Sequence, residues 1–434
     1  MTSTRTQTTN ELAINGGPKA FEGRTGKAEP KIGIEEFLSI AERFGFNETA
    51  MQRLRGAVSN DDLPEGGPNL ARFISTHPKP SKGEVYEAAA REFFGVKYAR
   101  PASSGTGALH AAMVGVGVGP GKEVIVPAVG FIATAMAVVL AGGRPVFCDI
   151  DESMTIDPEK IAPLITERTV AVAPTHWAGH VCGMDRIMAV AREHKIAVIE
   201  DCAQAPGASY KDNLVGTIGD VGCFSISAYK IIGGSEGGMF ISNDERIFER
   251  ASQLAEAGGL WRPDRFAPSR YDGELFAGAN YRLSELESAV DLVQLRKLPG
   301  IVQRFRTNCR RVVSQVEPCG HVRSRRSHDP EGDIGYEWRF IPESMELGAR
   351  IVEALQAEGI GAGMRGRSDR PDWHYYAQML PLVETKTAER AKHGDCPVAD
   401  DLFARTVRIS IDQWWSEADC DRVAAGINKV FAGI

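Results

Sequence analysis

The feature that most limits the possible folds is a regular alternation of short apolar runs with helical segments between residues 83 and 242. Seven of these runs are predicted to be strands, at 98–102, 123–127, 144–149, 169–174, 196–201, 222–226 and 238–242. Each has a mainly apolar stretch, which is typical of strands buried on both faces of a parallel sheet. Helical segments are expected after three of them, beginning at Gly105, Phe131 and Met184. The pattern therefore predicts βαβ units and an α/β fold with a mostly parallel seven-stranded sheet.

The start and the end of this alternation divide the chain into three regions. Residues 1–82 are irregular and contain Gly/Pro clusters, so we expect an N-terminal arm with one or two helices, one of them near Ile34–Phe44. Residues 83–300 contain the alternation and form the expected large domain. A long amphipathic helix is predicted to begin near Ser284, and the pattern is less regular after it. We therefore expect residues 301–434 to form a smaller C-terminal α/β domain.

Composition and charge exclude several classes of protein. The formal net charge is −7, which argues against binding to nucleic acid or to an anionic membrane. The two longest apolar stretches, Gly107–Gly119 and Phe131–Gly143, are too short to span a bilayer and are expected to be core helices. The eight cysteines are scattered and form no CxxC pair. We therefore expect no metal site and a reducing, cytoplasmic location.

A turn of small residues, SSGTGAL at 103–109, stands where a predicted strand is followed by a helix. Small residues let backbone N–H groups approach an oxyanion, and a helix N-terminus adds a favourable partial charge. Gly105 and Thr106 are therefore candidates for binding a phosphate group. Ser225, in another predicted strand, can add its hydroxyl to the same site. The alternative is a tight turn that needs small residues only for packing.

Asp201 ends an apolar run in the segment VIEDCAQA, and ligands of open α/β sheets bind at that edge. A carboxylate there can keep a ring nitrogen protonated, because an opposite charge favours the charged form. A protonated pyridine ring is an effective electron sink. Gln204, three residues later, can hydrogen-bond a phenolic oxygen on the same ring. Asp201 could instead only cap the next helix.

Lys230 follows a predicted strand in FSISAYK and precedes the glycine-rich segment IIGGSEGG. A lysine buried near other cations and apolar walls has a lowered pKa and becomes a nucleophile toward aldehydes. Phe131, in GFIATA, could stack on a planar cofactor. Each residue alone also has an ordinary explanation, because most lysines are surface charges and most phenylalanines belong to a core.

The order of these motifs resembles the DegT/DnrJ/EryC1/StrS family of sugar aminotransferases. The shared order is a Gly/Thr turn, an aromatic residue, Asp-x-x-Gln, and Ser-x4-Lys followed by EGG. Further matches are KEVIVPAVGFIATAMAVVLAGGRPVFCDID, PTHWAGHVCGMD, GTIGDVGCFS and GANYRLSELESA. The chain departs from the family at Gly130, where many relatives have T-[FW] before the stacking position. It also departs in the segment after Lys230, which is threonine-rich in relatives.

The resemblance implies a fold-type-I enzyme that uses pyridoxal 5′-phosphate (PLP), with pyridoxamine 5′-phosphate formed in the half-reaction. It assigns phosphate binding to Gly105, Thr106 and Ser225, ring stacking to Phe131, pairing with the ring nitrogen to Asp201, contact with the ring hydroxyl to Gln204, and the Schiff base to Lys230. Members of the family are homodimers with shared active sites. Asn280 matches the asparagine that reaches the partner's phosphate. His176 matches a cleft histidine that would contact substrate, although a structural role fits it nearly as well.

The implied reaction transfers an amino group from glutamate or glutamine to a keto-sugar, in amino-sugar or antibiotic biosynthesis. Lys230 would act as nucleophile and as general acid and base. The expected acceptor is a nucleotide-linked keto-sugar, including eight-carbon sugars, because residues 371–379 and 329–333 look most like that subgroup. The alternative acceptor is a keto-cyclitol of the aminoglycoside type. Two further alternatives are a sugar dehydratase of the same fold, which carries histidine at the lysine position, and a non-catalytic regulatory protein.

Overall fold

A computed structural model describes residues 12–23, 25, 30–64, 67–68, 70, 80–258, 276–366, 371–383 and 394–434. The chain forms two compact units, Met1–Leu70 with Ile74–Lys79, and Ala71–Phe73 with Pro80–Ile434. In the first unit, helices α1 (Ile34–Arg43) and α2 (Glu48–Ala57) pack against each other. The side chain of Asn47 caps α2 by accepting a hydrogen bond from the Ala50 N–H. The helix expected near Ile34–Phe44 is therefore present as α1.

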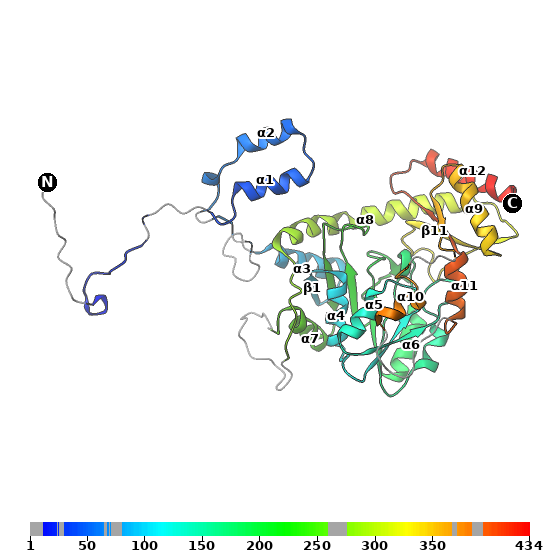
Figure 1. The fold of residues 1–434 in the computed structure, drawn as a ribbon, viewed down its shortest axis with the longest axis horizontal. Helices are drawn as coiled ribbons and strands as arrows, with labels where there is room; N and C mark the ends of the chain where they lie inside the picture. Colours follow the sequence, from blue (N-terminus) through cyan, green and yellow to red (C-terminus); the bar gives the residue numbers. More distant parts are fainter. Residues whose placement is uncertain are drawn as a thin grey trace. The chain divides into compact units, whose positions relative to one another are not determined.

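The second unit contains the expected seven-stranded sheet (Figure 1). Its strands are β1 (Tyr98–Ala102), β2 (Glu123–Pro127), β3 (Arg144–Cys148), β4 (Thr169–Val172), β5 (Ala197–Asp201), β8 (Val221–Ser225) and β9 (Gly238–Ser242). They lie in the order β1-β9-β8-β5-β4-β2-β3. The pairs β2–β3, β2–β4, β4–β5 and β5–β8 are parallel, whereas β9 runs antiparallel to both of its neighbours. The prediction of a mostly parallel sheet in an α/β fold is confirmed.

Helices cover both faces of this sheet. They are α3 (Lys82–Phe94), α4 (Gly105–Gly115), α5 (Ala133–Leu140), α6 (Met184–His194), α7 (Glu245–Ala255) and α8 (Glu285–Val313). Because successive strand residues point to opposite faces, Ile125 joins one core cluster while Val124 and Val126 join the other. Side chains of α3, α6 and α8 belong to the first cluster, and those of α4, α5 and α7 belong to the second.

The two long apolar stretches of the sequence contain α4 and α5, and most residues of these helices are buried. They are core helices, as expected. Among the described residues, no helix is long and apolar enough to cross a membrane. The cytoplasmic location stays a prediction.

The C-terminal part builds a second, smaller sheet. Its strands are β10 (Val322–Ser324), β11 (Glu337–Pro342), β12 (Ala362–Met364) and β13 (Val407–Ser410), all paired antiparallel in the order β10-β11-β13-β12. The helices of the C-terminal part are α9 (Met345–Ala357), α10 (Tyr376–Val383), α11 (Pro397–Arg405) and α12 (Glu417–Ala432), of which α10 packs on α5 beside the large sheet. The remaining elements are the hairpin β6 (Ser209–Tyr210) and β7 (Asn213–Leu214), and 3-10 turns at Ala13–Asn15, Asn60–Asp62, Pro158–Lys160, Ala162–Leu164 and Trp177–Gly179. Phe340 and Val407 lie in the apolar core of the smaller sheet.

The long helix expected near Ser284 is α8, and Ser284 caps it by accepting from the Glu287 N–H. It continues to Val313, so the domain boundary expected after residue 300 falls inside one helix. Its apolar face is continuous across that point, with Leu295, Leu298 and Val302 all buried. The helix contacts α3 near one end and α12 near the other, as Figure 1 shows.

Candidate active site

The ends of neighbouring parallel strands bring polar residues to one edge of the large sheet. Asp201 is the last residue of β5, and Ser225 is the last residue of β8. Backbone pairing continues past the end of β4, where Thr175 forms a parallel bridge with Asp201. Because these strands are parallel, their carboxyl ends meet at the same edge, which is where ligands of α/β sheets bind.

Asp201 is 1% exposed, and hydroxyl and amide groups of the protein hydrogen-bond its carboxylate. The Thr134 hydroxyl of α5 donates to Oδ2 at 2.5 Å, and the Thr175 hydroxyl is 3.5 Å from the same oxygen. The Ala203 N–H donates to Oδ1 at 3.0 Å. These hydrogen bonds fix the buried carboxyl group of Asp201 at the sheet edge.

Thr134 and Thr175 were not among the residues that the sequence predicted for this site. Thr134 lies in an apolar helix, one turn after Phe131. A hydroxyl group in such a helix is the sequence feature that could have marked it as a site residue. Thr175 directly follows Pro174, which ends an apolar run, and the sequence gives no reason to single it out. Only the bridge between β4 and β5 explains why it lies beside Asp201.

The small-residue turn packs directly against the end of β8. Ser104 caps α4, because its hydroxyl accepts from the Gly107 N–H at 3.0 Å. Gly105 is the first residue of α4, and a Cβ added to it would lie 2.7 Å from the Ser225 Cβ. Thr106 follows in the first turn of the helix. The structure thus places Gly105, Thr106 and Ser225 together at a helix N-terminus, where backbone N–H groups can bind an anion.

Lys230 lies five residues beyond the end of β8 and is half-buried. Burial lowers the pKa of its ammonium group, and the negative charge of Asp201 acts in the opposite direction. The two side chains are therefore electrostatic neighbours. A lysine amine with a lowered pKa is a better nucleophile at neutral pH.

Gln204 has its amide oxygen fixed, since Oε1 accepts from the Ala178 N–H at 2.8 Å. The side-chain NH2 is then the end that can donate to a ligand. Gln204 also lines a cavity of about 400 Å³ whose wall continues into the smaller sheet, with Arg339 and Arg408 among the lining residues.

Phe131 is 38% exposed, and its ring centroid lies 5.3 Å from that of His374. The neighbouring Gly130 donates its N–H to the His374 carbonyl at 3.0 Å. A Cβ added to Gly130 would lie 3.1 Å from the Thr175 hydroxyl oxygen. Gly130, where the chain departs from the family, is therefore a position at which the backbone lies close to the Thr175 side chain. The ring of Phe131 is partly accessible to a ligand.

Asn280 is exposed and is not brought together with the residues around Asp201. Its expected contact is with a partner subunit, so this role stays a prediction. The next residue, Tyr281, does reach the phosphate turn. Its carbonyl accepts from the Ser103 N–H at 2.6 Å, and its ring is close to Gly107.

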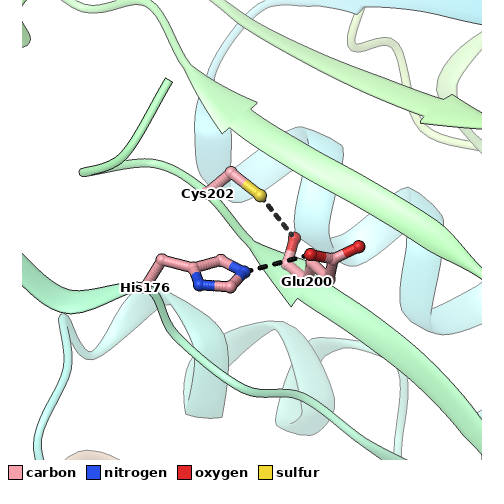
Figure 2. A group of neighbouring side chains, drawn as sticks. All are labelled: His176, Glu200 and Cys202. Carbon is pink, nitrogen blue, oxygen red and sulfur yellow. Dashed lines mark hydrogen bonds and ion pairs between the residues drawn. The ribbon is translucent and has the colours of Figure 1, made fainter. Parts of the chain in front are cut away.

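His176 does not reach the cavity, because it is completely buried. Figure 2 shows its ring next to Glu200 and Cys202. Nε2 lies 3.0 Å from Glu200 Oε2, and Nδ1 accepts from the Cys182 N–H at 3.1 Å. With Nδ1 accepting, Nε2 is the atom that donates to the carboxylate. Both ring nitrogens are satisfied inside the protein, which favours the structural alternative over a substrate contact.

His176, Glu200 and Cys202 also form the one group of potential metal ligands that lie within 4.8 Å of one another among the described residues. The Glu200 carboxylate accepts from the N–H groups of Gly216, Ile218 and Gly219 as well as from His176. Burial raises the pKa of the Cys202 thiol to about 12. The hydrogen bonds of Glu200 fix the loop before β8, so this cluster has a structural role.

Comparison with known proteins identifies the family. The model of the DegT/DnrJ/EryC1/StrS aminotransferase family matches residues 79–428. The chain belongs to this family. GDP-perosamine synthase of Caulobacter vibrioides is 33% identical over 353 residues, which are 80% of this chain and 89% of that protein. The L-glutamine:2-deoxy-scyllo-inosose aminotransferase of Micromonospora echinospora is 32% identical over 377 residues, 82% of this chain and 87% of that protein.

The fold agrees with that of a solved aminotransferase. The X-ray structure of the aminotransferase from Psychrobacter cryohalolentis superposes with a TM-score of 0.66 and 27% identity, covering 81% of this chain and 92% of that chain. The expectation of a PLP-dependent sugar aminotransferase is confirmed at the level of the family. This outcome favours the aminotransferase over the dehydratase and the non-catalytic alternatives.

The residues at the sheet edge fit PLP. Gly105 packs so closely against Ser225 that a side chain there would push the two elements apart, and the helix N-terminus beside them suits a phosphate. Asp201 supplies a buried carboxylate for a protonated ring nitrogen, and Lys230 supplies an amine with a lowered pKa. The chemistry of the set is thus that which the cofactor of this family needs.

We predict that Gly105→Ala weakens PLP binding by about tenfold or more, equivalent to about 1.4 kcal/mol. The added methyl group would meet Ser225 and displace the N-terminus of α4. The dissociation constant is measured by titrating the apoprotein with PLP and following absorbance. Gly119→Ala is the matched control, because a Cβ there meets nothing within 4 Å. Equal affinity in both variants would contradict the prediction.

We predict that Glu200→Gln destabilises the folded protein by about 3 kcal/mol or more. The new amide group would place a donor against N–H groups that now donate to the carboxylate. Denaturant unfolding followed by circular dichroism measures the change. Glu193→Gln, at an exposed position of α6, serves as the control and should leave the unfolding midpoint unchanged.

Proposed function

We propose that the residues assembled at the carboxyl edge of the large sheet bind PLP. Gly105, Thr106 and Ser225 bind the phosphate, and Asp201 pairs with the ring nitrogen. The Gln204 amide donates to the ring hydroxyl, since its oxygen is already occupied by Ala178. The single observation that carries this proposal is the position of Lys230, which is half-buried and close enough to Asp201 for the carboxylate to affect its pKa.

Bound PLP would supply the electron sink that stabilises the carbanion formed when an amino acid loses its α-proton. The protein's own groups do the rest. Lys230 Nζ would hold the cofactor and would take the proton from the donor Cα. Asp201, whose carboxylate Thr134 and Thr175 hold in place, would pair with the ring nitrogen. Phe131 would cover one face of the ring.

We further propose that the acceptor is a nucleotide-linked keto-sugar and that glutamate or glutamine is the donor. The cavity beside Gln204 supports an anionic acceptor. Arg339, Arg365 and Arg408 line it, together with the two carboxylates of Glu337 and Asp372. Cations thus outnumber carboxylates at this wall, and guanidinium groups bind diphosphates well.

Arg408 is the arginine best placed to bind the acceptor. Its Nη1 atom is 3.9 Å from Glu337 Oε2, and its side chain is 55% exposed. Arg339, by contrast, is paired with Glu337 and lies 4.1 Å above the Trp177 ring. A neutral keto-cyclitol is the second candidate acceptor, and the relative from Micromonospora echinospora favours it, because its name specifies such a substrate.

We also propose a homodimer whose subunits share active sites. Asn280 is exposed at the end of a segment that contacts the phosphate turn through Tyr281, so an asparagine there is available to a second copy. A dimer would place this side chain near the partner's phosphate site. Size-exclusion chromatography with light scattering tests the oligomeric state.

We predict that Lys230→Ala gives a folded protein without measurable turnover. The wild-type protein with PLP should be yellow, glutamate should bleach the colour, and borohydride should fix the cofactor on Lys230. The variant should bind PLP without that covalent link, which mass spectrometry after borohydride treatment checks. Lys297→Ala, at an exposed position of α8, should behave as wild type. Near-normal turnover of Lys230→Ala would refute the assignment.

We predict that Arg408→Gln raises KM for a nucleotide-linked keto-sugar about tenfold, corresponding to about 1.4 kcal/mol of lost binding. The donor half-reaction should be unchanged, because Arg408 is expected to contact only the acceptor. Steady-state kinetics with keto-sugar nucleotides and with a keto-cyclitol separates the two acceptor classes. Arg422→Gln, exposed on α12, is the control. Preference for the cyclitol, with no effect of Arg408→Gln, would favour the second candidate.

A further inference from the structure

The glycine-rich segment that follows Lys230, Ile231–Gly237, rests on the first turns of α8. The Glu287 carboxylate of α8 accepts a hydrogen bond from the Ser235 N–H at 2.6 Å. A Cβ added to Gly234 would lie 2.3 Å from Glu287 Oε1. A Cβ added to Gly237 would lie 3.0 Å from Asp291 Oδ2. The backbone of this segment is therefore in direct contact with two carboxyl groups, one turn apart on the same helix.

Asp291 is buried completely, and no side chain among the described residues hydrogen-bonds its carboxyl group. Two other buried polar atoms nearby, the hydroxyls of Tyr86 and Ser288, also lack partners there. A buried carboxylate without a partner is costly, whereas a neutral carboxylic acid is tolerated far better. The contact between α8 and the segment therefore accommodates Asp291 best when it is neutral.

The groups around Asp291 act on its pKa in two directions. Glu287 faces it from the same helix and raises the pKa, whereas the backbone of Gly234 faces it from the segment and lowers the pKa. Tyr86 faces it from α3. Burial, helped by the nearby Glu287 carboxylate, raises the pKa of Asp291 to about 8. The pKa of Tyr86 is raised well above its ordinary value by burial and by the same two acids. Asp291 thus ionises near pH 8.

The segment is tied to the residues that carry Lys230. The Ala228 N–H donates to the Ser235 carbonyl at 3.0 Å, and the Ile226 N–H donates to the Gly237 carbonyl at 2.8 Å. A Cβ on Gly233 would lie 2.3 Å from the Ser227 carbonyl oxygen, so the two halves of the loop are in close contact. Displacing residues 233–237 from α8 would therefore displace Lys230 as well.

We propose that Asp291 is a positioning residue for Lys230, whose neutral side chain lets the glycine-rich segment pack on α8. Ionisation of Asp291 would place a second negative charge beside Glu287 in a contact that excludes water. The segment would then move away from α8, and Lys230 would lose its alignment with the cofactor. The inference rests on the proposed role of Lys230, but the packing of the segment can be measured without any turnover.

The kinetic test compares pH profiles of kcat/KM for the holoenzyme and for Asp291→Asn, which is nearly isosteric and cannot ionise. With ionisation near pH 8, the ratio of wild-type to variant kcat/KM should fall about tenfold between pH 7 and pH 9. Asp212→Asn, at an exposed position, should give the wild-type profile. Parallel profiles for wild type and Asp291→Asn would overturn the proposal.

The structural test follows amide hydrogen exchange of residues 231–237 in wild type, with and without PLP, after correction for the intrinsic effect of pH. Protection should decrease between pH 7 and pH 9.5 in wild type and stay constant in Asp291→Asn. If the variant does not fold, the wild-type measurement still decides, because protection that is constant with pH overturns the proposal. Loss of the assigned role of Lys230 would leave this exchange result unchanged, so the two failures are distinguishable.

Discussion

Parallel strand pairing is the constraint on which the rest of the molecule depends. A parallel strand can be reached only by a crossover, and here α5 and α6 form two of these crossovers, while helices bury both faces of the sheet. The carboxyl ends of β4, β5 and β8 consequently lie at one edge. Asp201, Thr175 and Ser225 come from separate parts of the chain and meet for this reason alone. The order and direction of the strands therefore determine where the candidate active site lies.

Much of this arrangement could be read from the sequence, because strand burial leaves a strong pattern. The runs at Tyr98–Ala102, Glu123–Pro127 and Gly238–Ser242 match the observed strands residue for residue. The end of the large domain was harder to read. Leu298 and Val302 continue the apolar face of α8 past the expected boundary. The helical spacing of apolar residues does not show which sheet a helix packs on.

The site was only partly predictable, for a physical reason. Lys230 and Asp201 were predicted because each is a reactive residue type that stands at or just after the end of a predicted strand. Thr134 and Glu200 act through contacts with residues far away in the sequence, and only the folded chain shows these contacts. His176 illustrates the reverse case. Its position in a motif suggested a substrate contact, but whether a histidine faces a cavity or a core depends on packing that a single sequence does not display.

The length of α8 has a mechanical consequence. Its first turns support the segment that follows Lys230, and its last turns pack on α12 beside the sheet that contributes Arg408 to the cavity. Pro299 lies between these ends and lacks the N–H that would close the helical ladder there. The helix therefore bends most easily at Pro299. A change in the angle between the two sheets would therefore bend α8 at Pro299, between the turns that contact the loop after Lys230 and the turns that contact α12.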